Sequence, residues 1–427
     1  MKRNHILILL IFYIFFVISF LTNIMGALLP EIRSDFQMSL SMAAFLPFSF
    51  FAAYGVMSIP VGMVLEKSDE KTVMIIAFLA SLIGALTFSA FPGFKTAIFS
   101  LFLIGAGMAA LQVAINPLLR TAGGEENFAF NSVIAQLVFG AASFLSPLTY
   151  TYLVNELESG NANPNFLINT LKHLVPEDYS WVSLYWIFAL ISLVTAVILF
   201  FVKFPKVERK EDEVAGAWKT HVELFKNKTV IMFFIGIFAY VGTEQGIANW
   251  ISQFLQSYHG LSPRVEGAES VSLFWGMLTI GCLLGLVLLK LWDARKVLKF
   301  FTVLAIASLM LALLGSKELA LIAFPLTGFF ISVMWSVIFS LALNSMDKHH
   351  GSFSGILVTG IVGGAVVPLI IGSMADVIGL KYAMFFILIP LGYIFVLGYL
   401  AKPIILNKTL SVKEIKSIIF SKIKKAA

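Results

Sequence analysis

Charged residues are scarce in this chain, and cysteine is almost absent. Only 13% of the 427 residues are Asp, Glu, Lys or Arg, whereas 59% are hydrophobic. A soluble protein of this length could not hide so much apolar surface in a core and still cover its outside. The single cysteine, Cys282, excludes a disulfide within the chain and a metal site built from several cysteines. We interpret it as a small packing residue.

Motifs of soluble enzymes are also missing. The sequence contains no Gly-x-x-x-x-Gly-Lys-[Ser/Thr] loop, which argues against an ATP-driven pump. It contains no His-Glu-x-x-His and no Gly-x-Ser-x-Gly element either. We therefore expect a protein that is not an enzyme and that carries no metal or organic cofactor.

Long uncharged runs dominate what is present. About 20 consecutive apolar residues span a bilayer as a helix, so these runs predict an all-α membrane protein. Twelve of them can be read from the sequence: 6–30, 36–65, 72–94, 96–119, 127–155, 179–202, 229–256, 270–289, 300–316, 319–346, 351–375 and 382–401.

The basic residues predict the orientation of these segments. If both termini are cytoplasmic, 24 of the 30 lysine and arginine residues fall on the inner side, as the positive-inside rule requires. The net charge of +6 then reflects topology and contact with anionic lipid, and we expect no nucleic-acid partner.

The charged stretches between the runs predict the domain organisation. We expect an N-terminal six-helix bundle over 1–203, a cytoplasmic linker over 204–228 and a C-terminal six-helix bundle over 229–402. The last segment, 403–427, is basic with isoleucines among its lysines, and it is typical of an amphipathic tail on the inner leaflet.

Glu244 is the only charge near the middle of any of the long runs. Placing a carboxylate in the bilayer costs roughly 2.5–3.5 kcal/mol even on lenient insertion scales, so such a group normally faces a cavity or a partner. The alternative is a structural Glu that holds a helix bend beside Gly242 and Gly246.

Amide side chains in the runs form a second set of candidates. Amides both donate and accept hydrogen bonds, as sugar hydroxyls require, and Trp offers an apolar face to a sugar ring. The alternative is hydrogen bonding between helices. The candidate substrate-binding residues are Gln112, Asn116, Gln245, Asn249 and Trp250, with Asn23, Asn131 and Gln136 as second choices. Trp275 and Trp335 are further candidates for ring stacking.

Two segments carry a family resemblance. Gly-Met-Ala-Ala-Leu-Gln-Val-Ala-Ile-Asn-Pro (107–117) resembles the Gly-x-x-x-x-Glu-Thr-Ala-Ala-Asn-Pro helix of the fucose–galactose–gluconate:proton symporter family in the major facilitator superfamily. Tyr-Val-Gly-Thr-Glu-Gln-Gly-Ile-Ala-Asn-Trp-Ile (240–251) is similar to the seventh helix of sugar carriers in that group. The resemblance implies two six-helix bundles with both termini in the cytoplasm. The two halves of the sequence also echo each other, and we align the first helix with the seventh through Gly26 and Gly246.

The chain departs from that family at two positions. In the fucose symporters an Asp near the end of the first helix and a Glu on the fourth handle the proton and the sugar. The matching residues here are Gly26 and Gln112, which cannot take up a proton. Glu244 is then the acid left to couple transport to a proton or to Na⁺.

These observations predict a monomeric, multi-pass carrier in a bacterial inner membrane. We expect it to import a neutral monosaccharide by alternating access, coupled to a cation through Glu244. One alternative is a proton-coupled exporter of drugs or lipophilic cations. Another is a membrane sensor or partner-binding protein that transports nothing and uses the tail 411–427 as its interaction module.

Overall fold

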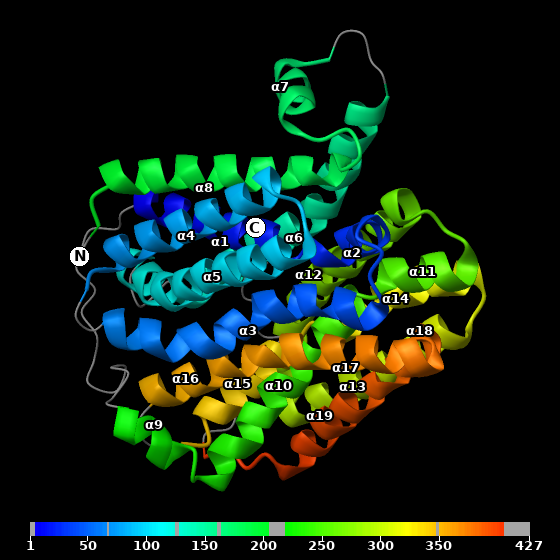
Figure 1. The fold of residues 1–427 in the computed structure, drawn as a ribbon. Helices are drawn as coiled ribbons and strands as arrows, with labels where there is room; N and C mark the ends of the chain where they lie inside the picture. The colour runs from blue at the N-terminus through cyan, green and yellow to red at the C-terminus, as the bar shows by residue number, and fades with distance from the viewer. Residues whose placement is uncertain are drawn as a thin grey trace, which may run out of the picture.

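The computed structural model describes residues 5–65, 68–123, 128–159, 164–204, 218–346 and 350–404, and within these ranges every regular element is helical. Figure 1 shows long helices that run side by side across the molecule, with the short helix α7 standing apart from them. The helices of the first half are α1 (His5–Thr22), α2 (Met25–Asp35), α3 (Leu40–Leu65), α4 (Glu70–Ala90), α5 (Phe94–Gly123), α6 (Phe128–Glu158), α7 (Phe166–Leu174), the 3-10 turn η2 (Ser180–Val182) and α8 (Ser183–Phe201).

The second half begins after the linker and repeats this pattern of long helices. Its elements are α9 (Trp218–Leu224), α10 (Lys228–Ala248), α11 (Ile251–His259), the π-helical turn η4 (Pro263–Gly267), α12 (Ala268–Leu291), α13 (Ala294–Leu314), α14 (Lys317–Ile331), α15 (Met334–Leu343), α16 (His350–Thr359), η5 (Gly360–Val362), α17 (Gly363–Ile378), α18 (Leu380–Met384), η6 (Phe385–Ile387) and α19 (Leu388–Leu400).

Twelve segments among the described residues are long and apolar enough to cross a membrane, which confirms the twelve predicted runs. An even number of crossings puts the start of α1 and the end of α19 on the same side of the molecule. We call this side the terminal face. The opposite side is the loop face, and its described loops are 36–39, 91–93, 164–179 with residue 159, 260–262, 315–316 and 379.

Short interruptions break several of the crossing helices. Asn23 and Ile24 separate α1 from α2, and Asn249 and Trp250 separate α10 from α11. Matching these two breaks pairs Asn23 with Asn249 and puts Gly26 opposite Ser252, six positions from the predicted match with Gly246. Broken helices leave backbone groups that a solute or another helix can use.

The two halves pack against each other along two seams. Helix α3 lies against α17, and α6 lies against α12, as Figure 1 shows for the first pair. Toward the loop face α2 also contacts α11, where a Cβ added to Gly26 would collide with the carbonyl oxygen of Ala248. Only glycine permits this approach of the first and seventh crossing segments.

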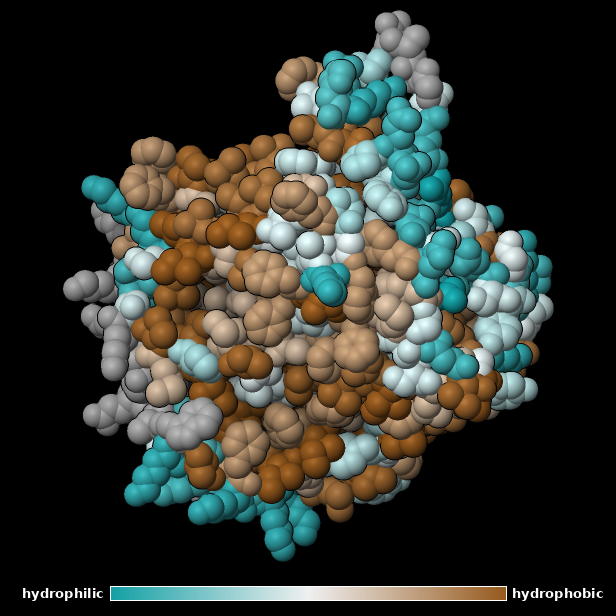
Figure 2. Space-filling view, in the orientation of Figure 1, coloured by the Kyte–Doolittle hydropathy of each residue, from teal (hydrophilic) through white to brown (hydrophobic). Residues whose placement is uncertain are grey.

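The surface agrees with immersion in a bilayer. Apolar side chains cover the middle of the view in Figure 2, and hydrophilic side chains gather at its ends. Large apolar side chains are exposed on the long helices, among them Ile76, Ile83, Phe200 and Phe201. This is a multi-pass membrane protein.

The loops that follow α3 and α12 each end in an aspartate that caps the next helix. Asp69 accepts hydrogen bonds from the backbone and hydroxyl of Thr72, at 3.0 and 2.8 Å. Asp293 accepts from the backbone of Arg295 at 2.8 Å and forms an ion pair with its guanidinium at 3.0 Å. Both are helix N-caps of the usual kind.

The structure describes only part of the linker and of the tail. Helix α9 packs against α16, so the end of the linker is attached to the second half. The charged part of the linker, 205–217, and the predicted amphipathic tail beyond Ile404 lie outside the described residues.

Candidate functional site

Glu244 lies near the end of α10, where it has one described partner. Tyr240 is four residues earlier on the same helical face, and its hydroxyl donates to Oε1 of Glu244 at 3.2 Å. The Glu244 side chain is partly exposed, whereas Thr243 and Gln245 on either side of it are buried. Within the described part of the chain, no lysine or arginine forms an ion pair with it. The carboxylate therefore lacks a fixed counter-charge.

An aromatic wall stands beside this carboxylate. The ring of Tyr240 lies 6.1 Å from that of Trp335 at an angle of 54°, and Trp335 stacks on Phe339 at 5.7 Å. Trp335 is partly exposed, and it belongs to α15, just after the break between α14 and α15. Aromatic faces of this kind bind the apolar face of a sugar ring. The structure thus brings Glu244 and Trp335 to the same place, with Tyr240 between them.

Gln245 and Asn249 form a pair on another side of α10. The Asn249 amide donates to Oε1 of Gln245 at 3.4 Å, and both side chains are buried. A Cβ placed on Gly364 would lie 3.0 Å from Cγ of Gln245 and 3.1 Å from the ring of Phe51. Gln245 therefore sits at the seam between the halves, where α3 meets α17.

Trp250 is completely buried at that same seam. Its ring lies against Gly372 of α17, and Ala44 of α3 meets the same glycine. Its indole nitrogen is buried and has no hydrogen-bond partner among the described atoms. In this conformation Trp250 is part of the packing around Gly372, where α3 meets α17.

Asn23 forms its hydrogen bonds with other residues of the first half. Its amide donates to Oγ of Ser143 on α6 at 2.8 Å, and Ser143 and Ser19 share a hydrogen bond of 2.6 Å. The side chain of Asn23 is buried. This arrangement is the hydrogen bonding between helices that we set out as the alternative to sugar binding.

The other amide candidates lie on α5 and α6. Gln112 is partly exposed on α5, which packs against α1, α3, α4 and α6. Asn131 is buried and Gln136 exposed on α6. Asn116 belongs to α5, but its side chain lies outside the described residues.

The structure changes the assessment of two aromatic residues, Trp275 and Tyr240. Trp275 is buried, and its indole nitrogen has no hydrogen-bond partner among the described atoms. Tyr240 was not a candidate, although its spacing of four from Glu244 was a usable signal. The described residues contain no group of three His, Cys, Asp or Glu side chains that could hold a metal ion. The groups available to bind a ligand are therefore hydroxyl, amide, carboxylate and aromatic groups.

Comparison with known proteins gives the family. A model of the major facilitator superfamily matches residues 11–361. A glucose/galactose transporter of Brucella abortus biovar 1 (strain 9-941) is 30% identical over 386 residues, which cover 89% of this chain and 90% of the relative. The L-fucose-proton symporter of Escherichia coli K12 is 23% identical, with 86% of each chain covered. These relatives are transporters, as the lack of enzyme motifs predicted.

Solved structures share the fold. A crystal structure of the E. coli fucose:proton symporter covers 94% of this chain and all of its own, at 21% identity and a TM-score of 0.67. A bacterial homologue of the human lysosomal transporter Spinster, in an inward-facing and occupied conformation, gives a TM-score of 0.75 at 15% identity, with 94% of this chain and 97% of its own covered. The predicted fold of twelve spanning helices and the resemblance to the fucose–galactose–gluconate:proton symporter family are confirmed, while the cytoplasmic position of the termini stays a prediction. The chain belongs to the major facilitator superfamily.

Proposed function

We propose that this protein imports a neutral monosaccharide across a bacterial inner membrane by alternating access, coupled to a proton or Na⁺ through Glu244. The observation that carries the proposal is the pairing of a partly exposed carboxylate with an aromatic wall: Glu244 bonded to Tyr240, and Tyr240 against Trp335. A carboxylate binds either a sugar hydroxyl or a cation, and a tryptophan face binds a pyranose ring.

The relatives support a sugar as the substrate. Their names give glucose, galactose and L-fucose, which are uncharged monosaccharides. Glu244 is the acid near the middle of a span, and no lysine or arginine occupies a comparable position, which disfavours an anionic substrate. We therefore propose that the site selects neutral sugars.

Glu244 is the strongest candidate for the coupling residue. A carboxylate inside a bilayer needs a compensating charge, and Glu244 has no described Lys or Arg partner. A bound proton or Na⁺ supplies that charge. Gly26, where the family carries an acid, is buried against the backbone of Ala248, so that position offers no substitute.

The orientation follows from the charges. The segments that the sequence predicts on the side of both termini contain 24 of the 30 lysine and arginine residues, so we assign the terminal face to the cytoplasm. The loop face is then the outside, from which the sugar enters.

Thermal stabilisation tests the proposal directly. The purified protein is heated with each member of a panel of monosaccharides, with and without Na⁺, between pH 5.5 and 8. A ligand that prefers the folded state raises the Tm by mass action. We expect one or a few neutral hexoses to raise it, with a dependence on pH or Na⁺ that identifies the coupling ion. A panel without effect, together with shifts caused by lipophilic cations, would replace the importer by an exporter.

A further inference from the structure

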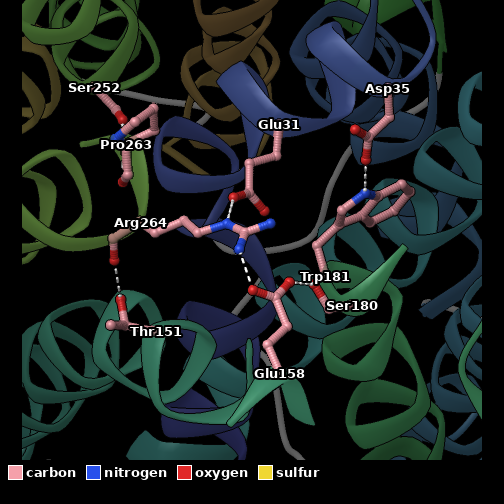
Figure 3. Close-up of polar contacts among 9 residues, drawn as sticks. All are labelled: Glu31, Asp35, Thr151, Glu158, Ser180, Trp181, Ser252, Pro263 and Arg264. Atoms are coloured by element: carbon pink, nitrogen blue, oxygen red, sulfur yellow. Dashed lines mark hydrogen bonds and ion pairs between the residues drawn. The ribbon is translucent and has the colours of Figure 1, made fainter. Parts of the chain in front are cut away.

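One arginine joins the two halves at the loop face. Arg264 lies in η4, at the start of the eighth crossing segment. Its Nε donates to Oε1 of Glu31 on α2, and its Nη1 donates to Oε2 of Glu158 at the end of α6. Figure 3 shows the guanidinium between the two carboxylates. A residue of the second half thus holds two helices of the first.

Neighbouring hydrogen bonds fix the members of this cluster. The hydroxyl of Thr151 donates to the backbone oxygen of Arg264 at 2.7 Å, and that of Ser180 donates to Glu158 at 2.7 Å. The indole of Trp181 donates to Asp35 at 2.6 Å (Figure 3). Glu158, Asp35 and the backbone of Arg264 are therefore each held by a hydrogen bond besides the ion pairs.

Other contacts close the same face. Asp376 of α17 accepts from the backbone of Leu40 and Ser41 at 2.8 and 3.0 Å, so a residue of the second half caps α3 of the first. Gly26 of α2 also meets the backbone of Ala248 at the end of α10. The halves are thus in contact at several points toward the loop face, and these contacts must separate before a solute can pass between the halves there.

We propose that Arg264 is the latch of the loop-face gate, and that its release from Glu31 and Glu158 is the step that opens the protein to that side. Separation of the halves would take Arg264 away and leave Glu31, Asp35 and Glu158 together on the first half. Like charges at short range repel, and Glu31 is only 10% exposed. Its Oε2 and the hydroxyl of Tyr150 are buried without hydrogen-bond partners among the described atoms. Arg264 is the one cationic partner of Glu31 in the described part of the chain.

The strength of the latch depends on ionic strength. Arg264 is 38% and Glu158 44% exposed, so dissolved ions reach the outer ion pair. Screening weakens exposed pairs much more than buried ones. Added salt therefore favours the open gate by weakening the ion pair of Arg264 with Glu158. The more buried ion pair of Arg264 with Glu31 is weakened less. None of this rests on the identity of the sugar or on the role of Glu244.

A cysteine reporter tests the latch without any substrate. Ser272 is 1% exposed and donates across the seam to the backbone oxygen of Phe144 at 2.5 Å, so Ser272→Cys in a Cys282→Ser background reports separation of the halves. A membrane-impermeant maleimide is applied to the loop face, and the rate of labelling is measured. We expect Arg264→Gln to raise this rate on the order of tenfold, the size of coupling found between contacting charges.

Arg33→Gln is the matched control. Arg33 also lies at the loop face and reaches across to Gln253, but it meets a neutral amide at 3.5 Å. The same substitution there should leave the labelling rate nearly unchanged. Glu31→Gln should accelerate labelling more than Glu158→Gln, because Glu31 is more deeply buried. Adding Glu31→Gln to Arg264→Gln should cause little further change, since the pair is already broken.

Equal labelling of the Arg264→Gln and Arg33→Gln proteins would overturn the proposal. So would additive effects of Arg264→Gln and Glu31→Gln. If Arg264→Gln does not give a monodisperse protein, Glu158→Gln and a NaCl titration of the protein with the latch intact take its place. Labelling of the intact latch should then rise with salt, and labelling that is independent of salt and of Glu158 would refute the latch. A protein that labels as expected but binds no sugar would leave the latch intact and refute only the proposed substrate.

Discussion

Two polar clusters inside the membrane-spanning helices use the same kinds of groups in opposite ways. Between α1 and α6, Asn23 is buried and bonded to Ser143, which is bonded in turn to Ser19. Between α10 and α15, Glu244 has one described donor, Tyr240, and remains partly exposed beside Trp335. A polar side chain inside the membrane is thus a candidate for function where neighbouring helices do not use up its hydrogen-bonding capacity.

The largest effect is expected for Glu244→Gln, which removes the charge that distinguishes the second cluster from the first. The amide keeps the shape and can still accept from Tyr240, but it cannot bind a proton. Uphill accumulation of sugar in vesicles should fall to the equilibrium level, while counterflow exchange continues. The measurement is accumulation of labelled sugar under an imposed proton or Na⁺ gradient. Uphill uptake that survives in this variant would show that Glu244 is not the coupling residue.

Substitutions of Trp335 test whether the aromatic wall beside Glu244 binds sugar. Trp335→Ala removes the ring that faces Tyr240, and stacking contributes about 0.5–1.5 kcal/mol, so the Kd for sugar should rise roughly 2- to 12-fold. Trp335→Phe is the conservative variant and should recover most of the affinity. Sugar titration by intrinsic fluorescence or calorimetry measures both. An unchanged Kd in Trp335→Ala would remove this residue from the site.

Ser143→Ala probes the other cluster, where the expected change is in stability. The substitution deprives the buried Asn23 amide of its 2.8 Å acceptor, and hydrogen bonds between membrane helices contribute about 0.6–1.7 kcal/mol. We expect a lower Tm and an unchanged Kd for sugar. A loss of sugar affinity without a change in Tm would instead assign Asn23 and Ser143 to the binding site.

The smallest effect is expected at Asp293, outside the membrane spans. Hydrogen bonding and ion pairing with Arg295 lower the pKa of Asp293 in the folded protein. A lowered pKa stabilises the fold above the ordinary value of about 3.9, and this contribution is lost as the pH falls through the folded value. The pair is partly exposed, so it contributes at most about 0.5 kcal/mol.

Asp293→Asn isolates that charge, because asparagine can still cap α13. The Tm of the variant should be slightly below that of the unaltered protein at pH 6, and the difference should shrink below about pH 4. A difference that stays constant across this range would mean that the cap, and not the charge, accounts for it.

Most of the fold could be predicted from the sequence, because a bilayer imposes a simple rule. Each of the twelve uncharged runs corresponds to a spanning segment, since backbone groups in hydrocarbon must be satisfied within a helix. The helix breaks were not predicted. Asn23–Ile24 and Asn249–Trp250 lie inside apolar runs. Only packing against other helices offsets the cost of interrupting the helical hydrogen bonds there.

The candidate site was predictable in part. Glu244 stood out because a charge in an apolar run is costly, and its spacing from Tyr240 was visible. Trp335 was one of several tryptophans, and nothing local set it apart from Trp275, which the fold buries. Arg264 gave no signal either, because its partners Glu31 and Glu158 are 233 and 106 residues away.

The class of protein, the number of spanning helices and the position of the one acid near the middle of a span could be predicted without a structure. They follow from local composition, because the transfer free energy of each segment into the bilayer depends on its own residues. Tertiary packing was needed to show which polar residues are satisfied by neighbouring helices, which remain available, and which charges join the halves. Those outcomes depend on distances between residues far apart in the chain, and no local pattern encodes them.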